Sequence, residues 1–132
     1  MSVEAKTFTT EDCGVLIVVS AGNNIIFFTD DDDTEDRDFI FNFDSVDFKS
    51  LYVYLTNLSF MKWPGFFPKI ANSSSSDYDE YYDKELDNNG YMEIRKNRLD
   101  IARPSPESTR LYVFTKAKMQ SFLFDLDRMV RG

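Results

Sequence analysis

The chain contains no histidine and only one cysteine, Cys13, among its 132 residues. Without histidine there is no imidazole to serve as the base of a catalytic triad, to ligate a metal or to titrate near neutral pH. One cysteine cannot form an intrachain disulfide or a cysteine-rich zinc site. The five glycines form no phosphate-binding loop. We therefore expect a non-enzymatic protein that needs no cofactor.

Long apolar runs are also missing. The longest aliphatic stretch, residues 15–19, is far shorter than the roughly 20 residues that a membrane helix needs. Residues 1–12 are polar and lack the basic and apolar regions of a secretion signal. A cytoplasmic protein without membrane contact is expected. Hydrophobic residues make up 42% of the chain and aromatic residues 16%, enough for the core of one domain over residues 1–132.

Two segments of the chain resemble each other, residues 14–58 and residues 90–130. Residues 41–52 align with residues 112–123, 71 positions later (112 minus 41), and each apolar position of one expected helix meets an apolar residue in the other. Both copies indicate short strands followed by an amphipathic helix. The pattern predicts an α+β fold of two pseudo-symmetric βββ(β)α repeats, with antiparallel sheets that are each packed by one amphipathic helix.

In the first copy we expect strands at residues 14–20, 24–29 and 38–43. The third alternates, so that Phe39, Phe41 and Phe43 share one face. Asp44 or Ser45 can then cap the helix. The apolar residues that follow at helical spacing are expected to form its buried face: Phe48, Leu51, Tyr52, Leu55 and Leu58.

In the second copy we expect strands at residues 91–96, 98–103 and 110–114, and a helix capped by Thr115. Residues 59–89 join the copies as a long loop, because the prolines in residues 61–68 are incompatible with a regular helix. A loop of this length is either functional or disordered. The expected buried stripe of the second helix is Met119, Phe122, Leu123, Leu126 and Met129.

An acidic run occupies residues 30–38. A calcium loop beginning at Asp30 would need glycine at its sixth position and glutamate at its twelfth, where the chain has Glu35 and Phe41. We therefore expect no metal site, and the run is either a solvated loop or an acidic contact for a basic partner. The residues that would make this contact are Asp30, Asp31, Asp32, Asp33, Glu35 and Asp36.

The formal net charge of -8 is divided unevenly. Residues 1–66 carry 12 acids and 4 bases, a net of -8, whereas residues 90–132 carry 9 bases and 5 acids, a net of +4. Cations interleaved with aromatic residues are typical of proteins that bind single-stranded nucleic acid, where they contact phosphates and stack on bases. A mixed, solvated sheet face is the alternative interpretation of the same residues.

Residues 90–130, with the helix entry YVFTKAKMQSF at residues 112–122, resemble a repeat of the PUR family. A related plan occurs in the Whirly family of single-stranded DNA binders. The resemblance implies two intertwined repeats whose curved sheets bind single-stranded DNA or RNA. It rests on element order and apolar spacing and covers both copies in outline. The chain departs from the family by showing three strands per copy rather than four, unless residues 6–10 and 59–89 supply the others.

Two functional hypotheses follow. The first is binding of single-stranded DNA or RNA on the sheet face of the second copy. The second is an acidic inhibitor, of the toxin-immunity or phage counter-defence type, that blocks a basic protein surface with residues 30–38 and 77–87. A homo-oligomer is left open. The nucleic-acid hypothesis assigns the phosphate contacts to Arg95, Lys96, Arg98, Arg103 and Arg110. It assigns base stacking to Tyr91 and Tyr112.

Overall fold

A computed structural model of the chain describes residues 4–11, 14–29, 38–71, 81–82, 90–105 and 110–131. In the described residues there are two groups of strands, and each group is followed by one helix. The elements are β1 (Glu4–Thr9), β2 (Val15–Ala21), β3 (Asn24–Phe28), β4 (Asp38–Asn42), α1 (Ser45–Lys62), β5 (Tyr91–Arg95), β6 (Arg98–Ala102), β7 (Tyr112–Phe114) and α2 (Lys116–Arg131).

The strands form two antiparallel sheets, with the orders β1-β2-β3-β7 and β4-β6-β5. The α+β class, the antiparallel pairing and the two helices are confirmed. The six strands expected from the sequence are all present, with ends that differ by one or two residues. Residues 6–10, a conditional candidate for a further strand, correspond to β1, which pairs with β2 along its whole length.

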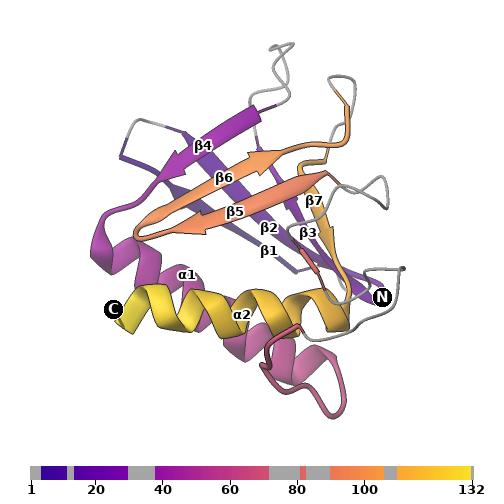
Figure 1. The fold of residues 1–132 in the computed structure, drawn as a ribbon. Helices are drawn as coiled ribbons and strands as arrows, with labels where there is room; N and C mark the ends of the chain where they lie inside the picture. Colours follow the sequence, from indigo (N-terminus) through magenta and orange to yellow (C-terminus); the bar gives the residue numbers. More distant parts are fainter. Residues whose placement is uncertain are drawn as a thin grey trace.

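Each sheet takes one strand from the other half of the chain. β7 lies beside β3, with Val113 opposite Ile26. β4 lies beside β6, with Ile40 opposite Asp100. Figure 1 shows the β4-β6-β5 sheet in front of the β1-β2-β3-β7 sheet, with both helices below them. The two halves therefore share both sheets.

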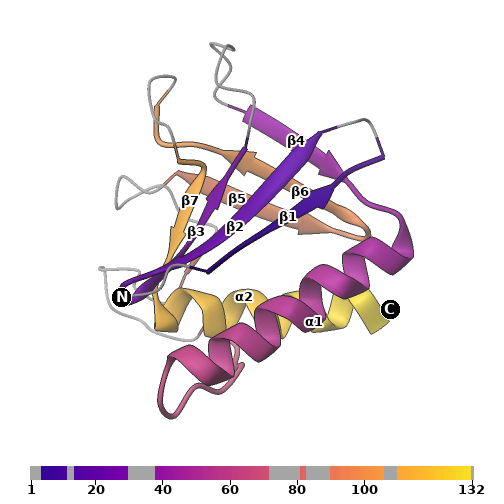
Figure 2. The ribbon, with the colours of Figure 1, turned by 180° about the vertical axis from the view of Figure 1, so that it is seen from behind.

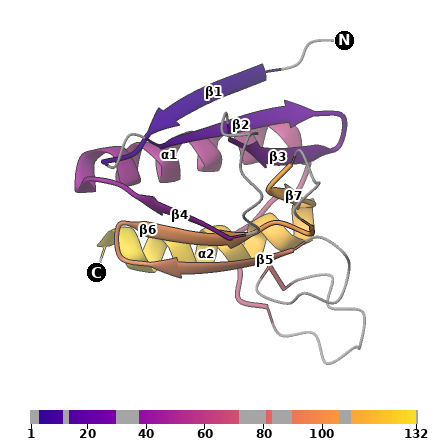
Figure 3. The ribbon, with the colours of Figure 1, turned by 90° about the horizontal axis from the view of Figure 1, so that it is seen from above.

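The helices pack against each other and close the bottom of the molecule. α1 lies on the side of β1, β2 and β3, and α2 lies on the side of β5 and β6 (Figures 2 and 3). α2 also contacts β7. It thus packs against strands of both sheets, so one helix per sheet is too simple a description.

An aromatic cluster joins the two halves in the core. The ring centroids of Phe27 on β3 and Phe114 on β7 are 4.9 Å apart, in an edge-to-face arrangement. Phe122 on α2 lies 4.9 Å from Phe114 and 6.3 Å from Phe27. All three side chains are fully buried. Large buried aromatic rings dominate core energetics, so this cluster holds the exchanged strand β7 in place.

α1 begins where the sequence predicts and ends later. The Asp44 carboxylate caps it by accepting a hydrogen bond from the Asp47 N–H at 2.7 Å. The helix continues to Lys62, so the expectation that residues 59–89 are entirely loop is wrong for its first turn. The helix ends immediately before Pro64, because a proline disfavours helical backbone at the residue before it, and Trp63 is extended. The Trp63 N–H still donates to the Ser59 carbonyl at 3.0 Å.

Two residues of the expected helical stripes are not core residues. Met129, near the end of α2, is 36% exposed. Tyr52 is partly buried and uses its hydroxyl between the helices. The remaining stripe residues are buried as predicted.

A hydrogen-bonded group links the two helices. The Tyr52 hydroxyl donates to Asp127 Oδ1 at 2.8 Å, and Arg131 Nε donates to the same oxygen at 2.7 Å. The Arg131 hydrogen bond, together with that of Tyr52, lowers the pKa of Asp127 below its ordinary value. Burial and the Asp127 hydrogen bond raise the pKa of Tyr52.

Substitution Tyr52→Phe tests this link. We expect it to reduce the free energy of unfolding by about 0.5–1 kcal/mol at pH 7, because one hydrogen bond to a carboxylate is lost. The pKa of Asp127 is lower in the folded protein than in the unfolded chain. Its contribution to stability is therefore complete at a pH above the unfolded-state pKa, and it is lost as the pH falls through the folded-state pKa. The difference between the two proteins in urea denaturation should therefore shrink below pH about 4. An unchanged difference at pH 2.5 would contradict the contact.

Candidate functional site

The outer face of the β4-β6-β5 sheet carries the first group of predicted site residues. Strand alternation and register place three rows on it. From one end to the other these rows are Tyr91, Ala102 and Asp38; Glu93, Asp100 and Ile40; and Arg95, Arg98 and Asn42. The sequence prediction that Tyr91, Arg95 and Arg98 share a sheet face is therefore consistent with the pairing.

Acidic neighbours balance the arginines on this face. Arg98 Nε lies 2.6 Å from Asp100 Oδ1, and Arg98 Nη2 lies 3.0 Å from Oδ2. Arg95 pairs with Glu93 at 2.7 Å and approaches Asp100 to 3.8 Å. The hydrogen bonds to Asp100 raise the pKa of Arg98. With Asp38 the face has three acids against two arginines, so it is not a cationic surface.

Two of the predicted contact residues are buried, and for them the prediction is wrong. Arg103 is 4% exposed, and its guanidinium lies 5.1 Å from the centre of the Phe39 ring. Tyr112 is fully buried and donates its hydroxyl hydrogen to the Tyr82 carbonyl at 2.9 Å. Burial leaves neither side chain a surface for phosphate or base. Tyr112 lies on the edge strand β7 and Arg103 directly follows β6. Local alternation in the sequence does not show which face of these segments the rest of the chain covers.

The remaining two predicted cations lie apart. Arg110 is exposed just before β7, the edge strand beside β3 in the other sheet. The N–H of the next residue, Leu111, donates to the Phe27 carbonyl. Lys96 is exposed in the turn between β5 and β6. The five predicted cations therefore do not converge on one surface.

The turn that carries Lys96 is fixed against the start of α1. Asn97 has a positive φ of 61°, a conformation that asparagine tolerates better than most residues. Its carbonyl accepts a hydrogen bond from the Phe43 N–H at 2.8 Å. The turn thereby brings Lys96 beside the first turns of α1, although the two are far apart in the sequence.

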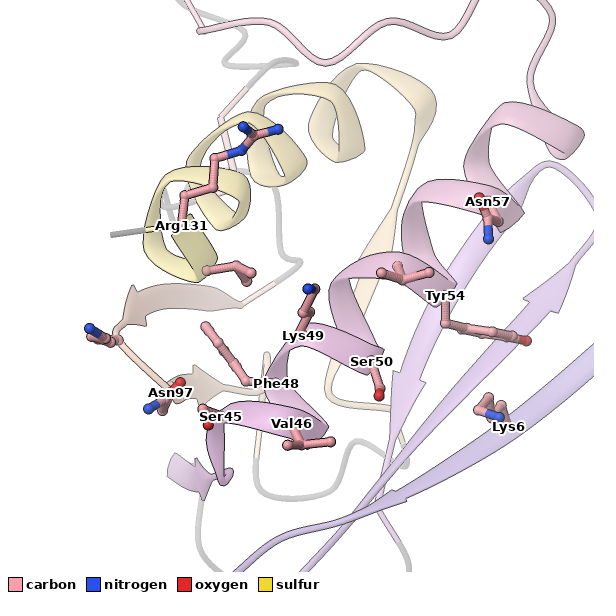
Figure 4. Close-up of a pocket in the computed structure, with 13 residues that line it drawn as sticks. Lys6, Ser45, Val46, Phe48, Lys49, Ser50, Tyr54, Asn57, Asn97 and Arg131 are labelled. Atoms are coloured by element: carbon pink, nitrogen blue, oxygen red, sulfur yellow. The ribbon is translucent and has the colours of Figure 1, made fainter.

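A groove of about 810 Å³ lies at this junction (Figure 4). It is bounded by β1, the exposed side of α1, the β5–β6 turn and the end of α2. Its lining consists of Lys6, Ser45, Val46, Phe48, Lys49, Ser50, Val53, Tyr54, Asn57, Lys96, Asn97, Val130 and Arg131.

The lining is cationic in an acidic protein. It contains Lys6, Lys49, Lys96 and Arg131 and no aspartate or glutamate. Figure 4 shows Lys49 between Lys6 on one side and Arg131 on the other. Arg131 is paired with Asp127. Lys49 and Lys96 form no ion pair within the described residues. The groove is the best-placed site for an anionic ligand in the described part of the chain.

Tyr54 forms the wall on the side of β1. The Lys6 ammonium lies 5.5 Å from the centre of its ring, and Phe8 meets it edge to face at 5.8 Å. Burial raises the pKa of Tyr54, and the nearby charge of Glu4 raises it further. Glu4 thus lies close to the groove without lining it.

Sequence reasoning found only one of the four groove cations, Lys96. Lys6, Lys49 and Arg131 come from β1, α1 and α2, and no local pattern connects them. The acids of the alternative hypothesis, Asp30 to Asp33, Glu35 and Asp36, lie outside the described residues, as does Cys13.

Comparisons with protein families, curated proteins and solved structures found no match for this chain. No helix in the described residues is long and apolar enough to cross a membrane. Over the same residues no cluster of three or more acidic or cysteine side chains could hold a metal ion. The groove must therefore be interpreted from its own chemistry.

Substitution Glu4→Gln tests the placement of β1 against α1. Removing the negative charge should lower the pKa of Tyr54, yet leave it above the ordinary value of 10.0, because burial is the larger cause. The pKa can be followed by NMR of protein with labelled tyrosine rings, with Tyr54→Phe to assign the signal. No change in the Tyr54 titration would show that Glu4 does not face the groove wall.

Proposed function

We propose that the protein is a non-enzymatic binding protein for single-stranded nucleic acid, whose phosphates enter the groove between β1, α1 and the β5–β6 turn. The observation that carries the proposal is the charge of the lining. Four cations and no acids line one groove, with Arg131 paired to Asp127, while the whole chain has a formal charge of -8. Such a local reversal of charge favours an anionic ligand at this position.

The shape of the site supports a chain of phosphates rather than a single anion. Lys6 and Arg131 lie on opposite sides of Lys49, so the cations extend along the groove. Arg95 and Arg98 flank Lys96 in sequence, but Glu93 and Asp100 pair with them, so they add no net charge to the row. Cations that follow a backbone are the general basis of single-strand binding.

Uncharged groups of the groove suit the same ligand. Hydroxyl and amide side chains there can bond phosphate and sugar oxygens: Ser45, Ser50, Asn57 and Asn97. Val46 and Val53 are 71% and 45% exposed and offer apolar contact to sugars and bases. Tyr91 lies half-buried on the neighbouring sheet face and remains the proposed stacking platform.

The strand exchange supports the resemblance to the PUR and Whirly families. Intertwined repeats require that part of each repeat join the sheet of the other. β4 and β7 do so, and each directly precedes the helix of its own half. This arrangement supports pseudo-symmetric repeats, although no counterpart of β1 occurs in the described residues of the second half. The proposed binding surface differs from the expected sheet face, because acids balance that face.

Binding can be measured by fluorescence anisotropy with labelled 20-nucleotide DNA and RNA strands at several salt concentrations. We expect Lys49→Gln combined with Lys96→Gln to weaken binding about tenfold or more at low salt, because two phosphate contacts are lost. The slope of log affinity against log salt should decrease by about 1.4, since each single-strand phosphate contributes about 0.7.

Lys69→Gln is the matched control for each of the two single substitutions, because it also removes one positive charge, beyond the far end of α1. It should leave both affinity and salt slope nearly unchanged. Absence of binding by the unaltered protein at low salt would refute the proposal and leave the inhibitor hypothesis. An equal loss in the control would show that net charge, and not the groove, determines binding.

Substitution Asp100→Asn should act in the opposite direction. It removes the carboxylate that holds Arg98 and approaches Arg95, so both guanidinium groups become available to phosphates beside the turn. We expect binding to strengthen several-fold at low salt, with a steeper salt dependence, in the same anisotropy measurement. Weaker binding would instead mean that the arginine positions set by Asp100 are needed for the contact.

A further inference from the structure

The end of α1 opposite the groove carries large apolar side chains that face solvent. Met61 is 83% exposed, Phe67 67%, Ile70 56% and Phe60 52%. All four belong to one short segment, residues 60–70, which we call the apolar tip. Figure 1 shows this segment protruding below the helices. Exposed apolar clusters of this kind mark interaction surfaces more often than scattered single residues do.

The backbone beneath these side chains is held firmly. Trp63 Nε1 donates to the Asn23 carbonyl at 2.9 Å, and its ring stacks on Phe66 at 5.8 Å. On the other side, Phe67 N–H donates to the Gln120 side chain and Lys69 N–H to the Gln120 carbonyl, both at 3.1 Å. The exposed residues are therefore presented on an anchored loop.

The tip contains no negative charge. Between Asp47 and Asp77 the sequence has no aspartate or glutamate. The tip carries two lysines: Lys69, which is exposed, and Lys62, whose Nζ donates to the Gly22 carbonyl at 2.7 Å. Nearby, Lys116 Nζ donates to the Pro64 carbonyl at 2.6 Å. The surface that the tip presents is thus apolar with a few cations and no acids.

We infer that the apolar tip is the contact surface between two copies of this chain. At their exposed fractions the four side chains present on the order of 400–500 Å² of apolar surface, since a large aromatic side chain buries about 150–250 Å². A two-fold contact then buries on the order of 1,000 Å² in total with the adjoining prolines, which is the lower end of specific interfaces. The dimer should therefore be concentration-dependent.

Electrostatics favours this end of the molecule for self-association. Two copies with a charge of -8 repel each other, and the repulsion is least where no acids meet. The groove lies at the other end of α1, so the dimer does not depend on the proposed function.

Sedimentation velocity of the full chain between 1 and 200 µM is the test. We expect a shift from monomer to dimer over this range. Sodium chloride at 0.5 M should not weaken the dimer, because the contact is apolar and salt screens the repulsion between two acidic copies. Phe67→Glu, and separately Met61→Glu, should keep the protein monomeric throughout. If one of the two variants fails to fold, the other still tests the contact. Thermal melts followed by circular dichroism check that each variant is folded.

Ile40→Glu is the control, since Ile40 is 51% exposed on the outer face of the other sheet. It should leave dimerisation unchanged. The inference is overturned by a protein that stays monomeric at 200 µM. It is equally overturned by a dimer that survives both tip substitutions, or by one that Ile40→Glu abolishes. Binding of anionic vesicles by the tip in place of a second copy would also overturn it.

Discussion

The exchange of strands between the two halves is the constraint on which the rest of the structure depends. β7 completes the sheet begun by β1, β2 and β3, and β4 completes the sheet of β5 and β6. The Phe27, Phe114 and Phe122 rings fix this exchange by packing β3, β7 and α2 together in the core. Because neither sheet is complete within one half, the halves are expected to fold as one cooperative unit.

The exchange also creates the groove. Residue 6 lies in the first half of the chain and residue 131 at its other end, yet both line one surface. The Phe43 to Asn97 hydrogen bond brings the β5–β6 turn against α1 immediately after the exchanged strand β4. The cationic lining is therefore a consequence of topology. None of the acidic side chains in the described residues lines the groove.

α1 contributes to both the core and the surface because it carries apolar side chains on more than one side. Phe48, Leu51 and Leu55 face the core, whereas Val46 and Val53 face the groove and Phe60 belongs to the tip. A helix that is apolar all round is normally buried. Its exposed positions at the groove and the tip are where we place a ligand and a second copy.

The sequence alone determined the class, the element order and most of the core, because alternation along strands and helical spacing are local properties of the chain. Phe48 and Phe122 were identified as core in this way. The pairing of Arg98 with Asp100 is also local, since residues two apart on β6 share a face. The partners of each strand and the burial of Arg103 and Tyr112 were decided only by tertiary structure. So was the meeting of Lys6, Lys49, Lys96 and Arg131. Such pairings depend on which distant segments pack together, and periodicity within a segment carries no information about that choice.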